Sequence, residues 1–171
     1  SRRPVVAVGA APARSRFARR ASEAGHDVPV LEQGQIGEPL ACPGHVSTDL
    51  WAYPPPGDRE ELLQNEVTGA RFHLGGPGSE AYPFYKDEPV SNVIDRVGLD
   101  RVLADAARDA GADVRTGHTV TAVERDEGAV RVTASTPDGA STSRGRMVAG
   151  CDGPTSRVRR GIGLPGPAER L

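Results

Sequence analysis

The stretch that most constrains the fold is VVAVGAAPAR, residues 5–14, in which branched apolar residues run into a turn of small residues. Pro4 to Val8 predicts a short buried strand. Residues 12–24 predict a helix that tolerates Pro12 in its first turn, and residues 27–32 predict a second strand, weakened by Pro29. A strand, a helix and a strand within about 30 residues are typical of the βαβ unit of nucleotide-binding folds.

The turn after the first strand carries an altered dinucleotide-binding pattern. The usual spacing is Gly-x-Gly-x-x-Gly, and here Gly9 is followed by Ala11 and Arg14 at the second and third glycine positions. Such a turn brings a pyrophosphate to backbone N–H groups at a helix N-terminus, and an acid about 20 positions later binds ribose hydroxyls. Glu32 has that spacing from Gly9. An ordinary βαβ unit with small residues at its turn is the alternative. The candidate cofactor contacts in this unit are Gly9, Ala11, Pro12, Ala13, Arg14, Glu32 and Gln33.

Two substitutions in this turn predict weakened cofactor binding. Ala11 places a methyl group where the backbone approaches the pyrophosphate, at a cost of about 1 kcal/mol or more if its φ is positive. Arg14 replaces a glycine that allows close packing of helix on strand, and its side chain could swing outward to a phosphate.

The rest of the chain predicts an α/β fold. Residues 34–60 are rich in glycine and proline and predict a long irregular segment. Residues 67–74, 81–86 and 89–95 predict antiparallel strands. Residues 98–112 predict a helix with Asp100 near its start and Gly111 at its end, and residues 113–117 predict a short strand. Residues 119–150 predict two alternating strands around a turn at RDEG, then a third run that ends in a buried strand, MVAG.

Composition excludes several classes. With 171 residues the chain can bury one core, and its net charge of −2 argues against nucleic acid as a partner. The two cysteines, Cys42 and Cys151, lack metal-binding spacing, so neither a metal site nor a disulfide framework is expected. No apolar run has the length of a transmembrane helix, and no signal peptide is visible. We expect a cytoplasmic protein, and the start at Ser1 suggests part of a longer chain.

The segment GCDGPTSRVRR, residues 150–160, follows the last predicted strand. In this order, after a βαβ start and a three-stranded excursion, it resembles the glutathione-reductase-like FAD oxidoreductases, most of all the geranylgeranyl reductase branch beside the aromatic hydroxylases. The resemblance implies that Asp152 and Gly153 lie next to the pyrophosphate of FAD, and that Ser156 and Arg159 begin the next helix. A tight Asp-Gly turn with a helix cap is the plainer interpretation.

Two other segments carry the same resemblance. In NVIDRVGLDRVLADAARDAGADVRTGHTVTAVER, Arg96 matches an arginine that contacts the flavin nucleotide, with Arg101 as the alternative, and Val120 matches a valine beside the adenine. In IGEPLACPGHVS the matching residues are Gly37, Pro39, Cys42 and Gly44. Cys42 would then lie near the isoalloxazine ring and is the one candidate catalytic residue. A surface arginine, a core valine and a small buried thiol are the alternatives.

The resemblance implies a Rossmann-like FAD-binding domain with a βαβ start and a three-stranded antiparallel excursion, joined to part of a second, β-rich substrate domain. Residues 1–35 and 95–165 would form the FAD/NAD(P)-binding domain. Residues 36–94 would form a loop and a partial antiparallel-sheet insertion of the substrate domain. The family's second Gly-Asp motif and its aromatic substrate-cavity signature are absent from the sequence, which therefore resembles the N-terminal part of such an enzyme.

Three functions follow from these patterns. The first is a flavin-dependent oxidoreductase that reduces isoprenoid (geranylgeranyl) double bonds in lipid biosynthesis, with FAD as cofactor. Its partners would be an isoprenoid lipid and an electron donor such as NAD(P)H or ferredoxin, with at most peripheral membrane contact. The second is an FAD-dependent aromatic monooxygenase. The third is a non-catalytic remnant of an FAD-binding fold.

Overall fold

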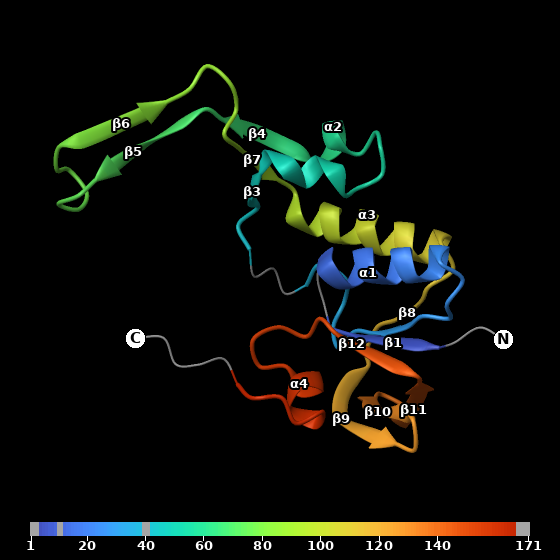
Figure 1. The fold of residues 1–171 in the computed structure, drawn as a ribbon. Helices are drawn as coiled ribbons and strands as arrows, with labels where there is room; N and C mark the ends of the chain where they lie inside the picture. Colours follow the sequence, from blue (N-terminus) through green and yellow to red (C-terminus); the bar gives the residue numbers. More distant parts are fainter. Residues whose placement is uncertain (1–3, 10–11, 39–41, 167–171) are drawn as a thin grey trace.

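A parallel four-stranded sheet forms the centre of the molecule. The computed structural model of the chain describes residues 4–9, 12–38 and 42–166. The sheet has the order β12-β1-β2-β8 and consists of β1 (Val5–Val8), β2 (Pro29–Leu31), β8 (Asp113–Arg115) and β12 (Met147–Gly150). Helices α1 (Pro12–Glu23) and α3 (Arg96–Asp109) lie side by side over one face of this sheet (Figure 1). The predicted βαβ start and the Rossmann-like fold class are confirmed.

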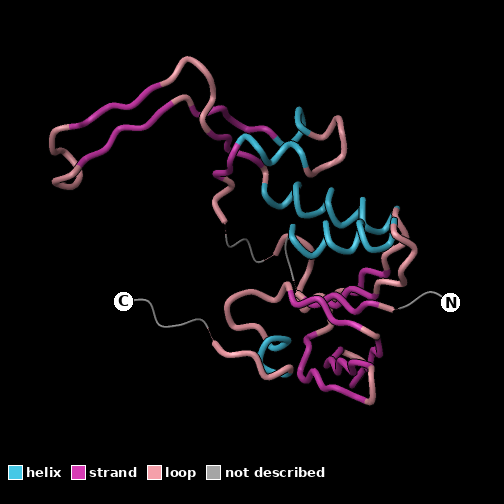
Figure 2. Tube along the Cα trace, in the orientation of Figure 1, coloured by secondary structure: helices cyan, strands magenta, loops and turns pink. Residues whose placement is uncertain are grey.

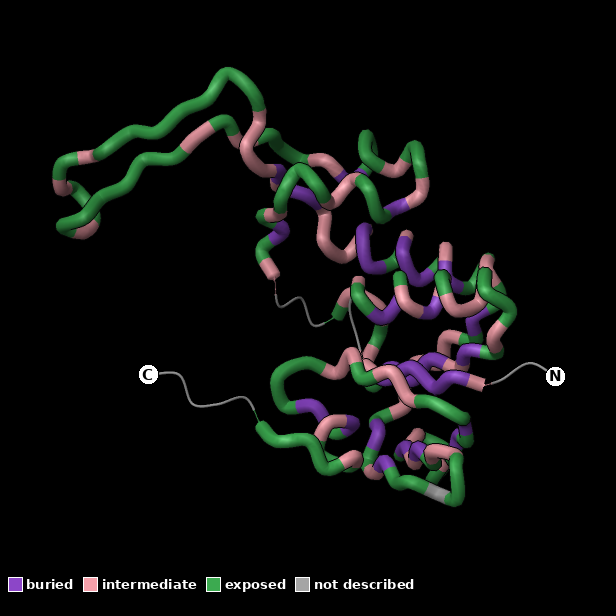
Figure 3. The backbone as a smooth tube through the Cα atoms, in the orientation of Figure 1, coloured by how far each residue is buried: buried purple, intermediate pink, exposed green. Residues whose placement is uncertain are grey.

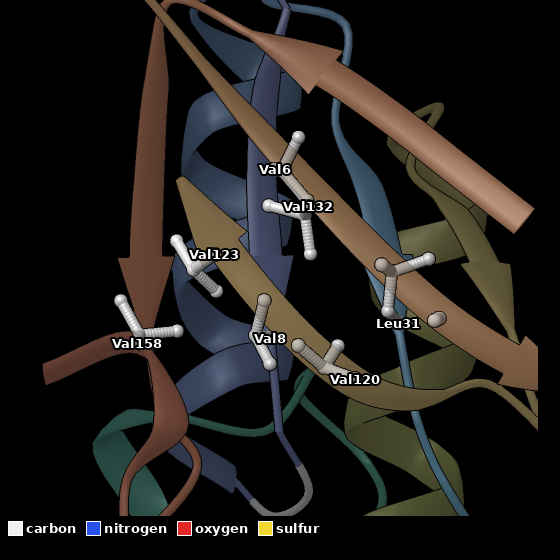
Figure 4. Close-up of a cluster of buried hydrophobic side chains, with 8 residues drawn as sticks. Val6, Val8, Leu31, Val120, Val123, Val132 and Val158 are labelled. Carbon is white, nitrogen blue, oxygen red and sulfur yellow. The ribbon is translucent and has the colours of Figure 1, made fainter. Parts of the chain in front are cut away.

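Strand β1 is buried on both faces because its alternate side chains enter two different cores. Ala7 packs with alanines and valines of the helical layer, including Ala18 and Ala107. Val6 and Val8 point the other way, into a valine-rich cluster (Figure 4). Small alanine side chains of β1, α1 and α3 meet on the helix side, whereas branched side chains fill the space between the two sheets on the other side.

The second core lies between the parallel sheet and a three-stranded antiparallel sheet. That sheet contains β9 (Thr119–Asp126), β10 (Ala129–Thr136) and β11 (Gly139–Gly145) in the order β11-β10-β9. Val120, Val123 and Val132 face Leu31 and the valines of β1 (Figure 4). The turn between β9 and β10 has positive φ at Glu127 (40°) and Gly128 (82°), the signs of a type I′ hairpin turn. The three-stranded excursion predicted from the sequence is confirmed.

A further layer packs against the far side of α3. A small sheet of order β3-β7-β4 contains β3 (His45–Ser47), β7 (Ser91–Ile94) and β4 (Leu63–Val67), and it is accompanied by the 3₁₀ helix η1 (Thr48–Ala52) and α2 (Arg59–Leu62). Leu62 and Ile94 bury their side chains against Leu99 and Leu103 of α3. The hairpin of β5 (Gly69–His73) and β6 (Ala81–Tyr85) projects away from this layer and is exposed along almost its whole length (Figures 1 and 3).

Several local predictions need correction. Residues 34–60 are not wholly irregular, because β3, η1 and the start of α2 lie within them, and β4 was missed (Figure 2). Helix α3 is capped by Asp95, whose carboxylate accepts from the N–H of Gly98, whereas Asp100 lies inside the helix. MVAG forms β12 but is not buried throughout, because it is the edge strand of the described sheet and Met147 is exposed. Among the described residues, no helix is long and apolar enough to cross a membrane.

A leucine in the contact between α3 and the small sheet should contribute strongly to stability. Leu99 is 1% exposed and Leu74, in the loop after β5, is 83% exposed. Leu99→Ala should lower the free energy of unfolding by about 2–5 kcal/mol through the lost burial and the cavity that remains. Leu74→Ala, the same chemical change on the surface, should change it by less than about 0.5 kcal/mol. Urea denaturation followed by circular dichroism measures both, and equal effects would contradict the described packing.

Candidate functional site

A cavity of about 530 Å³ opens where the carboxyl ends of β1, β2 and β12 meet. This is the place at which open α/β sheets bind their ligands. Its walls come from the strand ends, from the start of α1, from the segment before β9 and from the segment leading into α4 (Arg157–Gly161). The lining residues are Val8, Gly9, Ala13, Leu31, Gln33, His118, Val120, Cys151, Asp152, Gly153, Thr155, Arg157 and Arg160.

Gly9 lets two strand ends approach each other at the floor of this cavity. Its φ is 115°, and a Cβ at this position would collide with the carbonyl oxygen of Cys151. The N–H of Cys151 donates to the carbonyl of Val8 at 2.8 Å, and the N–H of Gly9 donates to the carbonyl of Leu31 at 3.1 Å. No side chain fits between the turn after β1 and the end of β12. The first glycine of the pattern is therefore required by the fold as well as by any bound nucleotide.

Arg14, at the third glycine position, turns inward. Its side chain is enclosed in the protein, with 1% of the residue exposed. Nη1 lies 2.6 Å from Oε2 of Glu32 and also donates to the carbonyl oxygen of Gly9. Glu32 is 1% exposed as well, and its Oε1 accepts from the N–H of Gly34 at 2.9 Å. The suggested outward reach of Arg14 to a phosphate is therefore not what the structure shows, because an internal carboxylate holds the guanidinium.

A second, partly buried ion pair lies at the start of α3. Arg96, the first residue of α3, donates through Nη2 to both carboxylate oxygens of Asp100, at 2.9 and 3.2 Å. The carboxylate of Asp100 also acts electrostatically on Arg14. Asp100 thus couples the Arg14–Glu32 ion pair electrostatically to the Arg96–Asp100 ion pair.

Burial lowers the pKa of Arg14, and the carboxylate of Glu32 opposes that shift. A guanidinium keeps its proton in proteins, so Arg14 remains a cation. A buried cation requires a partner that satisfies both its charge and its hydrogen bonds. Glu32 supplies both, which explains why the two side chains are drawn together.

The carboxylate of Asp152 caps the final helix. Its Oδ2 accepts from the N–H groups of Arg157 and Val158 at 2.7 and 3.2 Å, and its Oδ1 accepts from the hydroxyl of Ser156 at 2.5 Å. Ser156 in turn accepts from the N–H of Arg159 at 3.0 Å. The Asp-Gly turn and the helix cap are therefore one structure, in which Gly153 adopts a φ of 76° at the cavity wall.

The structure brings six of the predicted site residues together in the cavity wall: Gly9, Ala13, Gln33, Val120, Asp152 and Gly153. Val8 and Leu31 also line the cavity and were not predicted as site residues. Pro12 begins α1, whereas Arg14, Glu32, Cys42 and Arg96 do not line the cavity. Ala11 and Pro39 lie outside the described residues.

Sequence reasoning missed His118, Cys151, Thr155, Arg157 and Arg160 as cavity residues. His118 follows β8 and its Nδ1 lies 2.8 Å from the carbonyl oxygen of Thr116. Its place just past the end of a parallel strand is a signal that could have identified it, because carboxyl ends of such strands meet at one edge. Arg157 and Arg160 lie in the segment that carries the Asp-Gly turn, so the turn itself pointed to them.

The cavity fits a dinucleotide in most respects. Helix α1, of 12 residues, begins at Pro12, three positions after Gly9, and its positive end can face a pyrophosphate. Val120 and Leu31 offer an apolar wall for a ring, and Arg157 and Arg160 add positive charge. The exception is Glu32, which would bind ribose hydroxyls but is already paired with Arg14. The fold and this cavity define a dinucleotide-binding α/β domain.

Comparisons with known proteins identify the family. The sequence family described as FAD binding domain matches residues 73–170, more than half of the chain. The protein belongs to this family, and FAD is its cofactor.

Three relatives extend the match over almost the whole chain. A solved structure of a geranylgeranyl bacteriochlorophyll reductase-like protein from Thermoplasma acidophilum superposes with a TM-score of 0.81 at 28% identity, covering 96% of this chain and 43% of the other. Digeranylgeranylglycerophospholipid reductase 2 from Methanopyrus kandleri is 33% identical over 162 residues, 94% of this chain and 40% of the relative. A 12-dehydrotetracycline 5-monooxygenase/anhydrotetracycline 6-monooxygenase from Streptomyces rimosus is 29% identical over 170 residues, 96% of this chain and 33% of the relative.

These similarities confirm the resemblance to the geranylgeranyl reductase branch that the sequence motifs indicated. The chain spans 33–40% of the length of these curated relatives.

Replacing Gly9 should disrupt the strand contact on which the cavity depends. Gly9→Ala should lower the free energy of unfolding by about 2 kcal/mol or more, because it adds a collision with the Cys151 backbone to the strain of a positive φ. Gly25→Ala is the matched control, since Gly25 also has a positive φ (85°) but an added Cβ there meets no atom within 4 Å. That control should cost about 1 kcal/mol from backbone strain alone. Thermal and urea unfolding measure the difference, and equal losses would refute the close approach.

The thiol of Cys151 should ionise at a higher pH in the folded chain than in the unfolded chain. Burial raises the pKa of its thiol, Arg14 opposes the shift, and Asp152 adds to it. The neutral thiol therefore persists in the folded chain at pH values at which the unfolded chain already holds the thiolate. Iodoacetamide labelling of Cys151, followed by mass spectrometry across a pH series, should have its midpoint at higher pH in the folded chain than in urea. Coincident midpoints would show that the thiol is not affected by burial.

Proposed function

We propose that this chain is the FAD-binding part of a flavin-dependent oxidoreductase that saturates isoprenoid double bonds in lipid biosynthesis. The observation that carries the proposal is the likeness to the Thermoplasma acidophilum reductase-like structure, with a TM-score of 0.81 over 96% of the chain. The similarity to Methanopyrus kandleri digeranylgeranylglycerophospholipid reductase 2 supports the same substrate class. The partners would be an isoprenoid lipid and an electron donor such as NAD(P)H or ferredoxin.

Within this proposal, the residues of the chain bind and orient the cofactor. The backbone at Gly9 and the positive end of α1 would hold the pyrophosphate, and Val120 would support the adenine. Gly153 would let the chain run close to the cofactor beside the cap formed by Asp152. Reduced FAD bound there would supply a hydride to one carbon of the double bond, and the other carbon would take up a proton.

The division of the chain follows from the same proposal. Residues 1–35 and 95–165 would form the FAD/NAD(P)-binding domain, and residues 36–94 would belong to the substrate domain. The small sheet β3-β7-β4 and the projecting β5–β6 hairpin lie within the latter range. Cys42, which is half-buried just before β3, would lie near the isoalloxazine ring, and Arg96 would contact the flavin nucleotide.

A second candidate function is aromatic hydroxylation by an FAD-dependent monooxygenase. It is favoured by the 29% identity over 170 residues to the Streptomyces rimosus tetracycline monooxygenase. The two candidates share the cofactor site and differ in the substrate that reaches the flavin. The described cavity is the part that they have in common.

Titration of the purified chain with FAD, followed by flavin fluorescence and absorbance, tests the cofactor site. We expect saturable binding at micromolar FAD. Failure of FAD to bind would contradict the flavoprotein proposal and favour a non-catalytic remnant.

The substrate is tested with the longer, FAD-loaded enzyme of which this chain is proposed to be the cofactor-binding part. After anaerobic reduction with dithionite, a geranylgeranyl lipid should reoxidise the flavin, and mass spectrometry should show the lipid gaining two hydrogens per double bond. NADPH oxidation that is stimulated by a phenolic compound in air, with hydroxylated product and no lipid reduction, would instead establish the monooxygenase.

A further inference from the structure

Glu32 occupies the ribose-binding position of the dinucleotide pattern, but its carboxylate does not face the cavity. The flanking residues Leu31 and Gln33 line the cavity, whereas Glu32 does not. Glu32 is almost fully enclosed. A ribose hydroxyl in the cavity therefore meets the end of β2 without reaching the acid that should bind it.

Both carboxylate oxygens of Glu32 already accept hydrogen bonds from the protein. Oε2 accepts from Arg14 at 2.6 Å, and Oε1 accepts from the N–H of Gly34 at 2.9 Å. The hydrogen bond from the backbone N–H of Gly34, two residues away, is compatible with a ribose ligand because it occupies only one of the two carboxylate oxygens and leaves the charge in place. The bond to Arg14 is different, because a charged side chain from another element neutralises the acid.

Arg14 depends on Glu32 in return. It lies in the first turn of α1, where the helix dipole disfavours a cation, and that turn carries no acidic residue. Its Nε is buried and, within the described part of the chain, has no hydrogen-bond partner. Glu32 is thus the main group that compensates the buried charge of Arg14, with Asp100 contributing at longer range.

We propose that Arg14 is a built-in competitor for the ribose-binding carboxylate of Glu32, so that it weakens FAD binding at the adenosine end of the site. The inference rests on FAD binding to this cavity, as proposed above. A ribose can gain the Glu32 carboxylate only if the guanidinium leaves it, and otherwise the ribose is bound without the acid. In both cases FAD affinity is lowered by the ion pair between Arg14 and Glu32.

The test compares FAD dissociation constants of the purified chain and its variants by flavin fluorescence. Arg14→Ala should bind FAD about tenfold more tightly than the natural sequence, the effect of one hydrogen bond to a charged group. Arg14→Gln retains bulk and an N–H donor without the charge, and it should show a smaller gain. Circular dichroism shows whether each variant folds. If the unpaired Glu32 prevents Arg14→Ala from folding, Arg14→Gln still tests the proposal.

Arg20→Ala is the matched control, because it removes the same charge from the same helix at a side chain that is 76% exposed. It should leave FAD affinity unchanged or slightly weaker, since FAD is an anion. The double variant Arg14→Ala/Glu32→Gln should lose the gain, because the gain requires the freed carboxylate. ADP, which carries the adenosine ribose and the pyrophosphate, should show the same pattern, whereas riboflavin should show no gain.

The outcomes separate this inference from the proposed function. If the natural chain binds FAD and the Arg14 variants bind no more tightly than Arg20→Ala, the competitor role is overturned while FAD binding stands. A gain that survives in the double variant also overturns it, because the effect would not pass through Glu32. Absence of FAD binding in every variant overturns both the inference and the proposed cofactor site.

Discussion

The burial of β1 between two unlike layers is the constraint on which the rest of the structure depends. Ala7 packs on the side of the two helices, and Val6 and Val8 pack against the antiparallel sheet. Because side chains alternate along a strand, a shift of one residue in register would turn Val6 and Val8 toward the helices and Ala7 toward the antiparallel sheet, where their volumes do not fit the space available. The position of the turn at Gly9, and hence of the cavity, follows from that fixed register.

The nucleotide turn shows how a fold can retain its shape while its chemistry changes. The first glycine is retained because two backbones meet at Gly9, a steric requirement that is present with or without a ligand. The third position tolerates Arg14 because Glu32 stands within reach and compensates its charge. Glu32, which could bind a ribose, serves instead as the counterion of Arg14. The same carboxylate cannot stabilise the buried arginine and bind a ligand at once.

The larger features of the fold were predictable because local patterns determine them. The VVAV run, the periodic helix that became α3 and the alternating strands around the RDEG turn each carry their own signal, and all formed. The short elements β3, η1 and β4 were not visible, because segments of three to five residues form only through their contacts with α3. In the site, strand ends such as Gly9 and Asp152 could be located by motif. The inward turn of Arg14 could not, because it depends on the three-dimensional distance to Glu32.

The pairing of β1 with β12 has a consequence for how the chain acquires its structure. Val5 pairs with Met147, so β1 receives this neighbour only after all the residues between the two strands have been synthesised. Until then β1 has only β2 beside it, and one of its edges is open to other chains. Sheets that rely on such distant pairings form slowly, because the entropy of closing the loop is lost before the contacts are gained. Until β12 has been synthesised, β1 is an exposed, aggregation-prone apolar strand. We expect chaperones that bind short valine-rich segments to act on it at that stage.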